Sequence, residues 1–174
     1  MQKKLILLCV MLSFALILKE HVYEKESIVL IQKEIDQEVQ RVKASFDGTL
    51  LSIEAIGFEM VVHVVSKEDI QAKLDENKIV SLSDYQKDNY LIFGHYTKLQ
   101  GVLFNKLNEL KVNDTMSINN QNKTYTYLVE QVGTIQRNEY DSLLDKDSIL
   151  LLTCTSDYND DLYYYIKGRL KEEA

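Results

Sequence analysis

Proline and tryptophan are absent from this chain of 174 residues, and glycine occurs only six times. Without proline, tight turns have to be made by glycine, asparagine, aspartate or serine. Eleven tyrosines are present, and tyrosine favours strands. The hydrophobic share of 45% and the charged share of 27% are ordinary for a folded protein. The length therefore predicts one domain with its own core, plus short appendages.

Cysteine and basic charge are also scarce. Cys9 lies inside an apolar run near the start, and Cys154 stands alone in the remainder, so no disulfide is possible within the globular part. Acidic residues outnumber basic ones by 27 to 20, which gives a formal net charge of -7. Because a phosphate backbone attracts a basic surface, no nucleic-acid partner is expected.

The first residues, MQKK, are followed by an apolar run from Leu5 to Leu18. This pattern is typical of a secretion signal, and the run is shorter than the roughly 17–25 residues of a spanning helix. No small-x-small cleavage site follows it, so residues 1–19 favour an uncleaved signal-anchor over a cleaved signal. Lys3 and Lys4 place the N-terminus in the cytoplasm. We expect a single-pass protein of the cell membrane with an extracellular domain.

Residues 20–47 predict a helical linker, because apolar residues recur at spacings of three and four. Residues 48–174 predict a mostly β domain with short helices. Expected strands lie within Leu50–Val65 (two strands or one bent strand), Tyr90–Gly94, Thr115–Ile118, Thr124–Val129, Asp147–Cys154 and Leu162–Leu170. Lys67–Lys78 predicts a helix, and Val102–Asp114 begins as a helical or 3₁₀ segment. Many short strands indicate a β-barrel or a sandwich.

Cys154 and His95 are the candidate catalytic residues. Each follows a short apolar strand, and strand ends are where rigid scaffolds present reactive side chains. A lone cysteine with a distant histidine is a candidate nucleophile, although a buried structural thiol is the commoner case. His63 lies within an alternating strand, which favours a structural role, and His21 adjoins the apolar run. Placement alone leaves open whether Cys154 and His95 form a pair.

Five short motifs occur in order along residues 50–170. They are Gly94-His95, the Leu-rich stretch from Leu103 to Asp114, Tyr125-Thr126-Tyr127, Leu150-Leu151-Leu152-Thr153-Cys154, and Lys167-Gly168-Arg169-Leu170. Together they resemble the sortase family, the cysteine transpeptidases of Gram-positive bacteria, whose signature is Thr-Leu-x-Thr-Cys. The resemblance implies a single closed β-barrel with short helices, preceded by the anchor and linker helices.

The resemblance also implies a mechanism and partners. Cys154 would attack a sorting signal similar to Leu-Pro-x-Thr-Gly and form a thioester, and His95 would protonate the leaving amine. The substrates would be surface proteins or pilins with such a signal. An amine of a cell-wall precursor or of a pilin lysine would resolve the thioester. No cofactor or metal is expected, because Asp157, Asp160 and Asp161 are better explained as a solvated loop.

The chain departs from the family pattern at three positions. Leu150 replaces the first threonine of the signature, and Asn113 replaces a turn glycine, whose left-handed backbone asparagine tolerates. The essential arginine of the strand after the cysteine falls on Tyr163. Arg169 lies roughly 20 Å further along that strand, and Arg137 approaches the site only if its loop folds over it.

We therefore interpret Tyr163 as the positional replacement in a catalytic set with Cys154 and His95. Its lack of charge motivates an alternative, a degenerate sortase-like protein that binds sorting signals or pilins with little turnover. A cysteine hydrolase that releases its substrate to water is a third possibility.

Overall fold

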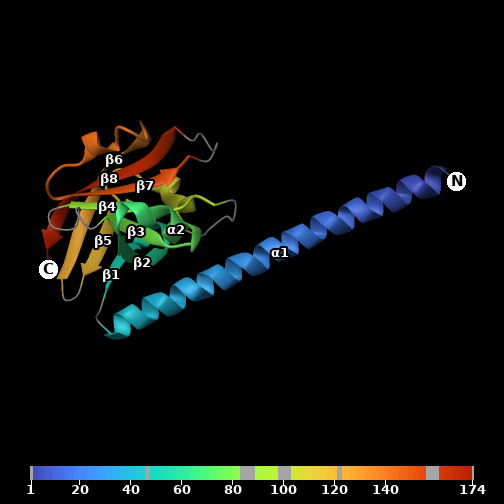
Figure 1. Ribbon diagram of the computed structural model, residues 1–174, viewed down its shortest axis with the longest axis horizontal. Coiled ribbons are helices and arrows are strands. Elements are labelled where there is room, and N and C mark those ends of the chain that lie inside the picture. The colour runs from blue at the N-terminus through green and yellow to red at the C-terminus, as the bar shows by residue number, and fades with distance from the viewer. Residues whose placement is uncertain are drawn as a thin grey trace.

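The computed structural model describes residues 2–45, 48–82, 89–97, 103–120, 123–155 and 161–173. Eight strands form a closed barrel in the order β1-β2-β3-β4-β7-β8-β6-β5, and a long helix, α1, precedes them (Figure 1). The pairs β2–β3 and β4–β7 are parallel, and the other neighbours are antiparallel. The predicted fold class, a mostly β closed barrel with short helices behind an N-terminal helix, is confirmed.

The strands are β1 (Thr49–Ile53), β2 (Phe58–Val65), β3 (Ile79–Leu82), β4 (Asn89–Phe93), β5 (Thr115–Asn120), β6 (Lys123–Gln136), β7 (Ser148–Cys154) and β8 (Leu162–Glu173). The helical elements of the described residues are α1 (Gln2–Ser45), η1 (Glu54–Ile56), η2 (Lys67–Asp69), α2 (Ile70–Asp75), η4 (Leu103–Glu109) and η5 (Tyr140–Leu143). The sequence had not indicated β3, whose four residues carry too little alternation. It also ended β6 at Val129, well before its actual end at Gln136.

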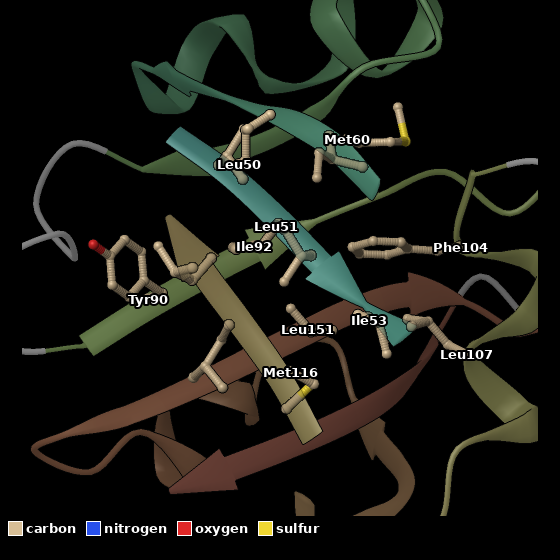
Figure 2. Close-up of a cluster of buried hydrophobic side chains, with 14 of the residues drawn as sticks. Leu50, Leu51, Ile53, Met60, Tyr90, Ile92, Phe104, Leu107, Met116 and Leu151 are labelled. Carbon is tan, nitrogen blue, oxygen red and sulfur yellow. The ribbon is translucent and has the colours of Figure 1, made fainter. Parts of the chain in front are cut away.

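Two apolar clusters occupy the two faces of the barrel wall. Alternate residues of a strand face opposite sides, so Ile149 and Leu151 belong to the interior cluster while Leu150 and Leu152 belong to the exterior one. Figure 2 shows the interior cluster, which Phe104 and Leu107 of η4 enter from one end. Residues of α2, η5 and β8 cover the exterior cluster. His95 and Cys154 follow the last apolar residues of β4 and β7 that belong to the exterior cluster, Phe93 and Leu152.

The predicted signal-anchor and linker segments form one continuous helix, α1, whose N-terminal end extends away from the barrel (Figure 1). Near its other end, Ile35, Val39 and Val42 are buried in the main apolar cluster, and Ile28 and Ile31 pack against it. The predicted apolar stripe therefore attaches this helix to the barrel. In the described part of the chain, no helix is both long and apolar enough to cross a membrane.

Candidate functional site

His95, Cys154 and Tyr163 occupy one row across neighbouring strands. In the parallel pair β4–β7, Phe93 lies opposite Leu152, so His95 comes level with Cys154 two residues later. In the antiparallel pair β7–β8, Cys154 lies opposite Tyr163. Neighbouring strands are about 4.8 Å apart. The two catalytic candidates that the sequence singled out are thus brought to adjacent strand ends.

The backbone before His95 is held against β7. Gly94 continues the β4–β7 ladder beyond β4, because its N–H donates a hydrogen bond of 3.0 Å to the carbonyl of Leu152. A Cβ atom at Gly94 would lie 2.3 Å from the ring of Phe104. Glycine at this position therefore lets η4 pack directly behind the strand end that presents His95.

Arg137 also reaches the thiol. Its Nη2 donates a hydrogen bond of 3.3 Å to Cys154 Sγ. Ile135 lies opposite Tyr163 in the β6–β8 pair, and Arg137, two residues on, has the same parity. The backbone N–H of Arg137 donates to the carbonyl of Asp161 at 2.9 Å, which continues the ladder one residue past β6.

From the sequence, we expected Arg137 to approach the thiol only if its loop folded over the site. The structure brings it to the thiol without such a loop. Arg137 follows directly after β6 and lies opposite Asp161, two residues beyond the level of Tyr163. Its long side chain reaches back across β8 to the sulfur. The missed signal was the continued strand character of residues 130–136, which places Ile135 and Arg137 on one face.

Tyr163 lies beneath the guanidinium. Arg137 Cζ is 4.7 Å from the centroid of the Tyr163 ring, a cation–π distance. The rings of Phe93 and Tyr140 lie 6.1 and 6.2 Å from that of Tyr163. Burial raises the pKa of Tyr163 above its ordinary value, although the charge of Arg137 opposes the shift. The tyrosine is therefore a neutral aromatic surface at physiological pH, and its role in catalysis stays a prediction.

A cavity of about 270 Å³ opens on the other side of the thiol. Two threonines that flank Cys154 in sequence line it, and the hydroxyl oxygens of Thr153 and Thr155 are buried without a hydrogen-bond partner among the described residues. The remaining lining residues come from the turn after β4, from η4, and from the facing ends of β6 and β8; they are Tyr96, Phe104, Asn105, Asn108, Thr134, Leu162 and Tyr164. The half-buried Cys154 thus lies between the guanidinium of Arg137 and the cavity.

Arg169, the other arginine that the sequence considered, is engaged away from the site. Arg169 lies opposite Ser148, at the far end of β7 from the thiol, and its Nε is 2.8 Å from Glu130. Within the described ranges, no group of three or more histidine, cysteine, aspartate or glutamate side chains is arranged to hold a metal ion. Asp157 and Asp160, two of the three loop aspartates considered from the sequence, lie outside those ranges.

Comparisons with known proteins agree with this architecture. A family model described as the sortase domain matches residues 51–170. The chain is 29% identical over 126 residues to sortase A of Bacillus anthracis, an alignment that covers 69% of this chain and 58% of that protein. This chain therefore spans less than two thirds of the length of that relative.

Solved structures share the fold. The sortase D5 transpeptidase of Clostridium perfringens has a TM-score of 0.64 at 19% identity, with 79% of this chain and 98% of that one covered. Sortase A of Listeria monocytogenes has a TM-score of 0.61 at 21% identity, covering 73% and 88%. Since the family model spans well over half of the chain and nearly the whole barrel, the chain belongs to the sortase family.

Proposed function

We propose that this protein is a cysteine transpeptidase that cleaves a sorting signal of the Leu-Pro-x-Thr-Gly type and transfers the protein to an amine. The observation that carries the proposal is the pairing of Cys154 with the strand end of His95, beside a cavity that opens at the thiol. A structural thiol would need neither an accessible cavity nor a charged neighbour. The membership of the family, whose solved members include a named transpeptidase, supports the same chemistry.

The reaction has two acyl transfers. The Cys154 thiolate adds to the threonine carbonyl of the signal, and the tetrahedral intermediate collapses as His95 protonates the departing amine. This step breaks the peptide bond and forms a thioester. An incoming amine then attacks the thioester carbonyl while His95 accepts its proton, so the thiolate leaves and a new amide forms. Tyr163, opposite Cys154, is the third member of the proposed catalytic set with Cys154 and His95.

The substrates that fit this chemistry are surface proteins or pilins with a C-terminal sorting signal. The incoming amine would belong to a cell-wall precursor or to a pilin lysine. One structural relative, sortase C of Streptococcus pneumoniae, is described with reference to pilin substrate specificity. An N-terminal signal-anchor with the barrel outside the cell would place the enzyme where such substrates emerge.

A peptide library of sorting signals, offered with and without an added amine, tests the proposal. Mass spectrometry should find a thioester adduct on Cys154 and an amide product that requires the amine. Cys154→Ala should abolish both, and His95→Gln should lower the transfer rate by about 10²–10⁴-fold. Transfer that survives in Cys154→Ala would refute the assignment of the nucleophile. Release of free acid in place of the amide product would favour the hydrolase.

The tyrosine at position 163 favours one second candidate, a sorting-signal-binding protein with little turnover. A binding protein of this kind would bind peptides of the library measurably but would form no adduct on Cys154 with any of them. An adduct on Cys154 that an added amine converts to the amide product would exclude this candidate.

A further inference from the structure

We propose that Arg137 is the cationic catalytic residue of this site, delivered from the end of β6 and held on the ring of Tyr163. The inference rests on the proposed function. It assigns to Arg137 two tasks, which are to stabilise the Cys154 thiolate and to donate hydrogen bonds to the oxyanion that forms when the thiolate attacks.

The first argument is contact with the reacting atom. Arg137 Nη2 lies 3.3 Å from Cys154 Sγ, so the guanidinium is in hydrogen-bond range of the nucleophile itself. A cation at this distance favours the thiolate over the thiol. The same cation lies next to any carbonyl carbon that bonds to the sulfur, and therefore next to the oxygen on which negative charge develops.

The second argument is preorganisation. The backbone of Arg137 is fixed by its hydrogen bond to Asp161, and its guanidinium lies over the Tyr163 ring. That ring is itself held by an edge contact with Phe93 and a tilted contact with Tyr140. Donors that are already positioned require no reorganisation during the reaction, which is the condition for strong electrostatic stabilisation.

The third argument is spare donor capacity. A guanidinium carries five N–H donors, and the buried Nε of Arg137 has no hydrogen-bond partner among the residues that the structure describes. Buried donors in native proteins are nearly always paired. Because Nε is itself covered, a carbonyl or oxyanion of a bound substrate would accept from the Nη groups beside Cys154.

The fourth argument is that two other cations of β8 are engaged by acidic residues. Lys167 and Arg169, both on β8, bond to Asp145 and Glu130 respectively. Arg169 is moreover at the opposite end of the strand from Tyr163. Tyr163 therefore keeps its position beside the thiol but serves as the surface on which a cation from the next strand rests.

Two measurements on Arg137→Gln test the proposal, with Arg169→Gln as the matched control. The first is the rate of Cys154 alkylation by iodoacetamide across a pH series, followed on the peptide that contains Cys154 so that Cys9 does not contribute. No substrate is needed. We expect Arg137→Gln to react roughly tenfold more slowly at neutral pH, and Arg169→Gln to react like the parent protein.

The second measurement is transfer of a sorting-signal peptide to an amine. We expect kcat/KM to fall by about 10²–10³-fold in Arg137→Gln and to recover partly in Arg137→Lys, which restores the charge. The double variant Arg137→Gln/Tyr163→Arg should also recover part of the rate, because Tyr163 lies directly opposite Cys154. Circular dichroism and thermal unfolding establish that each variant is folded.

The outcomes separate this inference from the proposed function. Alkylation and transfer within about twofold of the parent in a folded Arg137→Gln would overturn the role of Arg137, as would equal losses in Arg169→Gln. If the parent protein transfers no peptide, the proposed function fails. Slow alkylation in Arg137→Gln would then still support the action of Arg137 on the thiol.

Discussion

Gly94 and Phe104 show at the scale of single residues why two of the sequence motifs occur together. Phe104 is almost fully buried, and its ring occupies the space that a side chain at position 94 would need. The glycine precedes the catalytic candidate His95, and the phenylalanine is the second residue of η4, which lines the cavity beside Cys154. The Gly94-His95 motif and the Leu-rich stretch are therefore linked, because the missing side chain of Gly94 leaves room for the ring of Phe104.

Gly94→Ala should destabilise the protein by about 1–3 kcal/mol, the usual cost of overpacking a filled core. Gly133→Ala is the matched control, because its Cβ would meet the Tyr165 ring only at 3.2 Å. Urea unfolding measures both variants. Equal free energies of unfolding for the two variants would contradict the close contact between position 94 and Phe104.

Asn113 is a residue whose backbone conformation the sequence predicted. It replaces a turn glycine, and asparagine tolerates left-handed geometry better than other residues with a side chain. Its φ angle is 77°, and its N–H donates to the carbonyl of Val129 at 2.9 Å. The prediction is confirmed because turn chemistry depends on a few adjacent residues.

At the scale of elements, the contact between α1 and the barrel includes a charged cluster around Glu38. The Lys78 ammonium lies 2.7 Å and His63 Nε2 lies 3.4 Å from the Glu38 carboxylate. Burial alone would raise the pKa of Glu38, but Lys78 and His63 outweigh it, so the pKa lies below its ordinary value. Burial lowers the pKa of His63, and Glu38 opposes this only in part.

These shifts predict that acid weakens the protein in two stages. Between the lowered pKa of His63 and its ordinary value near 6.5, the unfolded chain binds a proton that the folded chain does not, so stability falls as pH falls. The contribution of Glu38 is present above about pH 4.5 and is lost as pH falls through its lowered folded pKa. The structural role that the sequence assigned to His63 agrees with this contact.

We expect His63→Gln to lose less stability than the parent protein between about pH 7 and about pH 5.5. Urea unfolding at a series of pH values measures the difference. His21→Gln, on an exposed part of α1, is the control and should follow the parent profile. An unchanged pH dependence in His63→Gln would show that His63 does not couple protonation to folding.

At the scale of the whole molecule, the C-terminal part of α1 belongs to the folded unit. Ile35, Val39 and Val42 are buried in the same cluster as the barrel interior, and Lys43 bonds to Glu59 of β2 at 2.7 Å. One apolar cluster therefore includes residues of both the predicted linker at 20–47 and the predicted domain at 48–174. The division of the chain into these units stays a prediction.

A protein that begins at Glu26 should unfold like the full chain, because it keeps the side chains of α1 that are described as packing on the barrel: Ile28, Ile31, Ile35, Val39 and Val42. One that begins at Gly48 should be several kcal/mol less stable, at roughly 1.5–3 kcal/mol for each buried aliphatic side chain removed. Thermal and urea unfolding compare the two. Equal stability would mean that the helix contributes nothing to the folded barrel.

The sequence by itself determined the local features of this protein: most of its strands, the apolar stripe of α1, and the placement of Cys154 and His95 at strand ends. Those features depend on alternation and turn residues within short windows. Only the tertiary structure decided which arginine approaches the thiol. Arg137 and Cys154 meet across β8 through the registers of two strand pairs. Register between distant strands is set by the closure of the whole barrel.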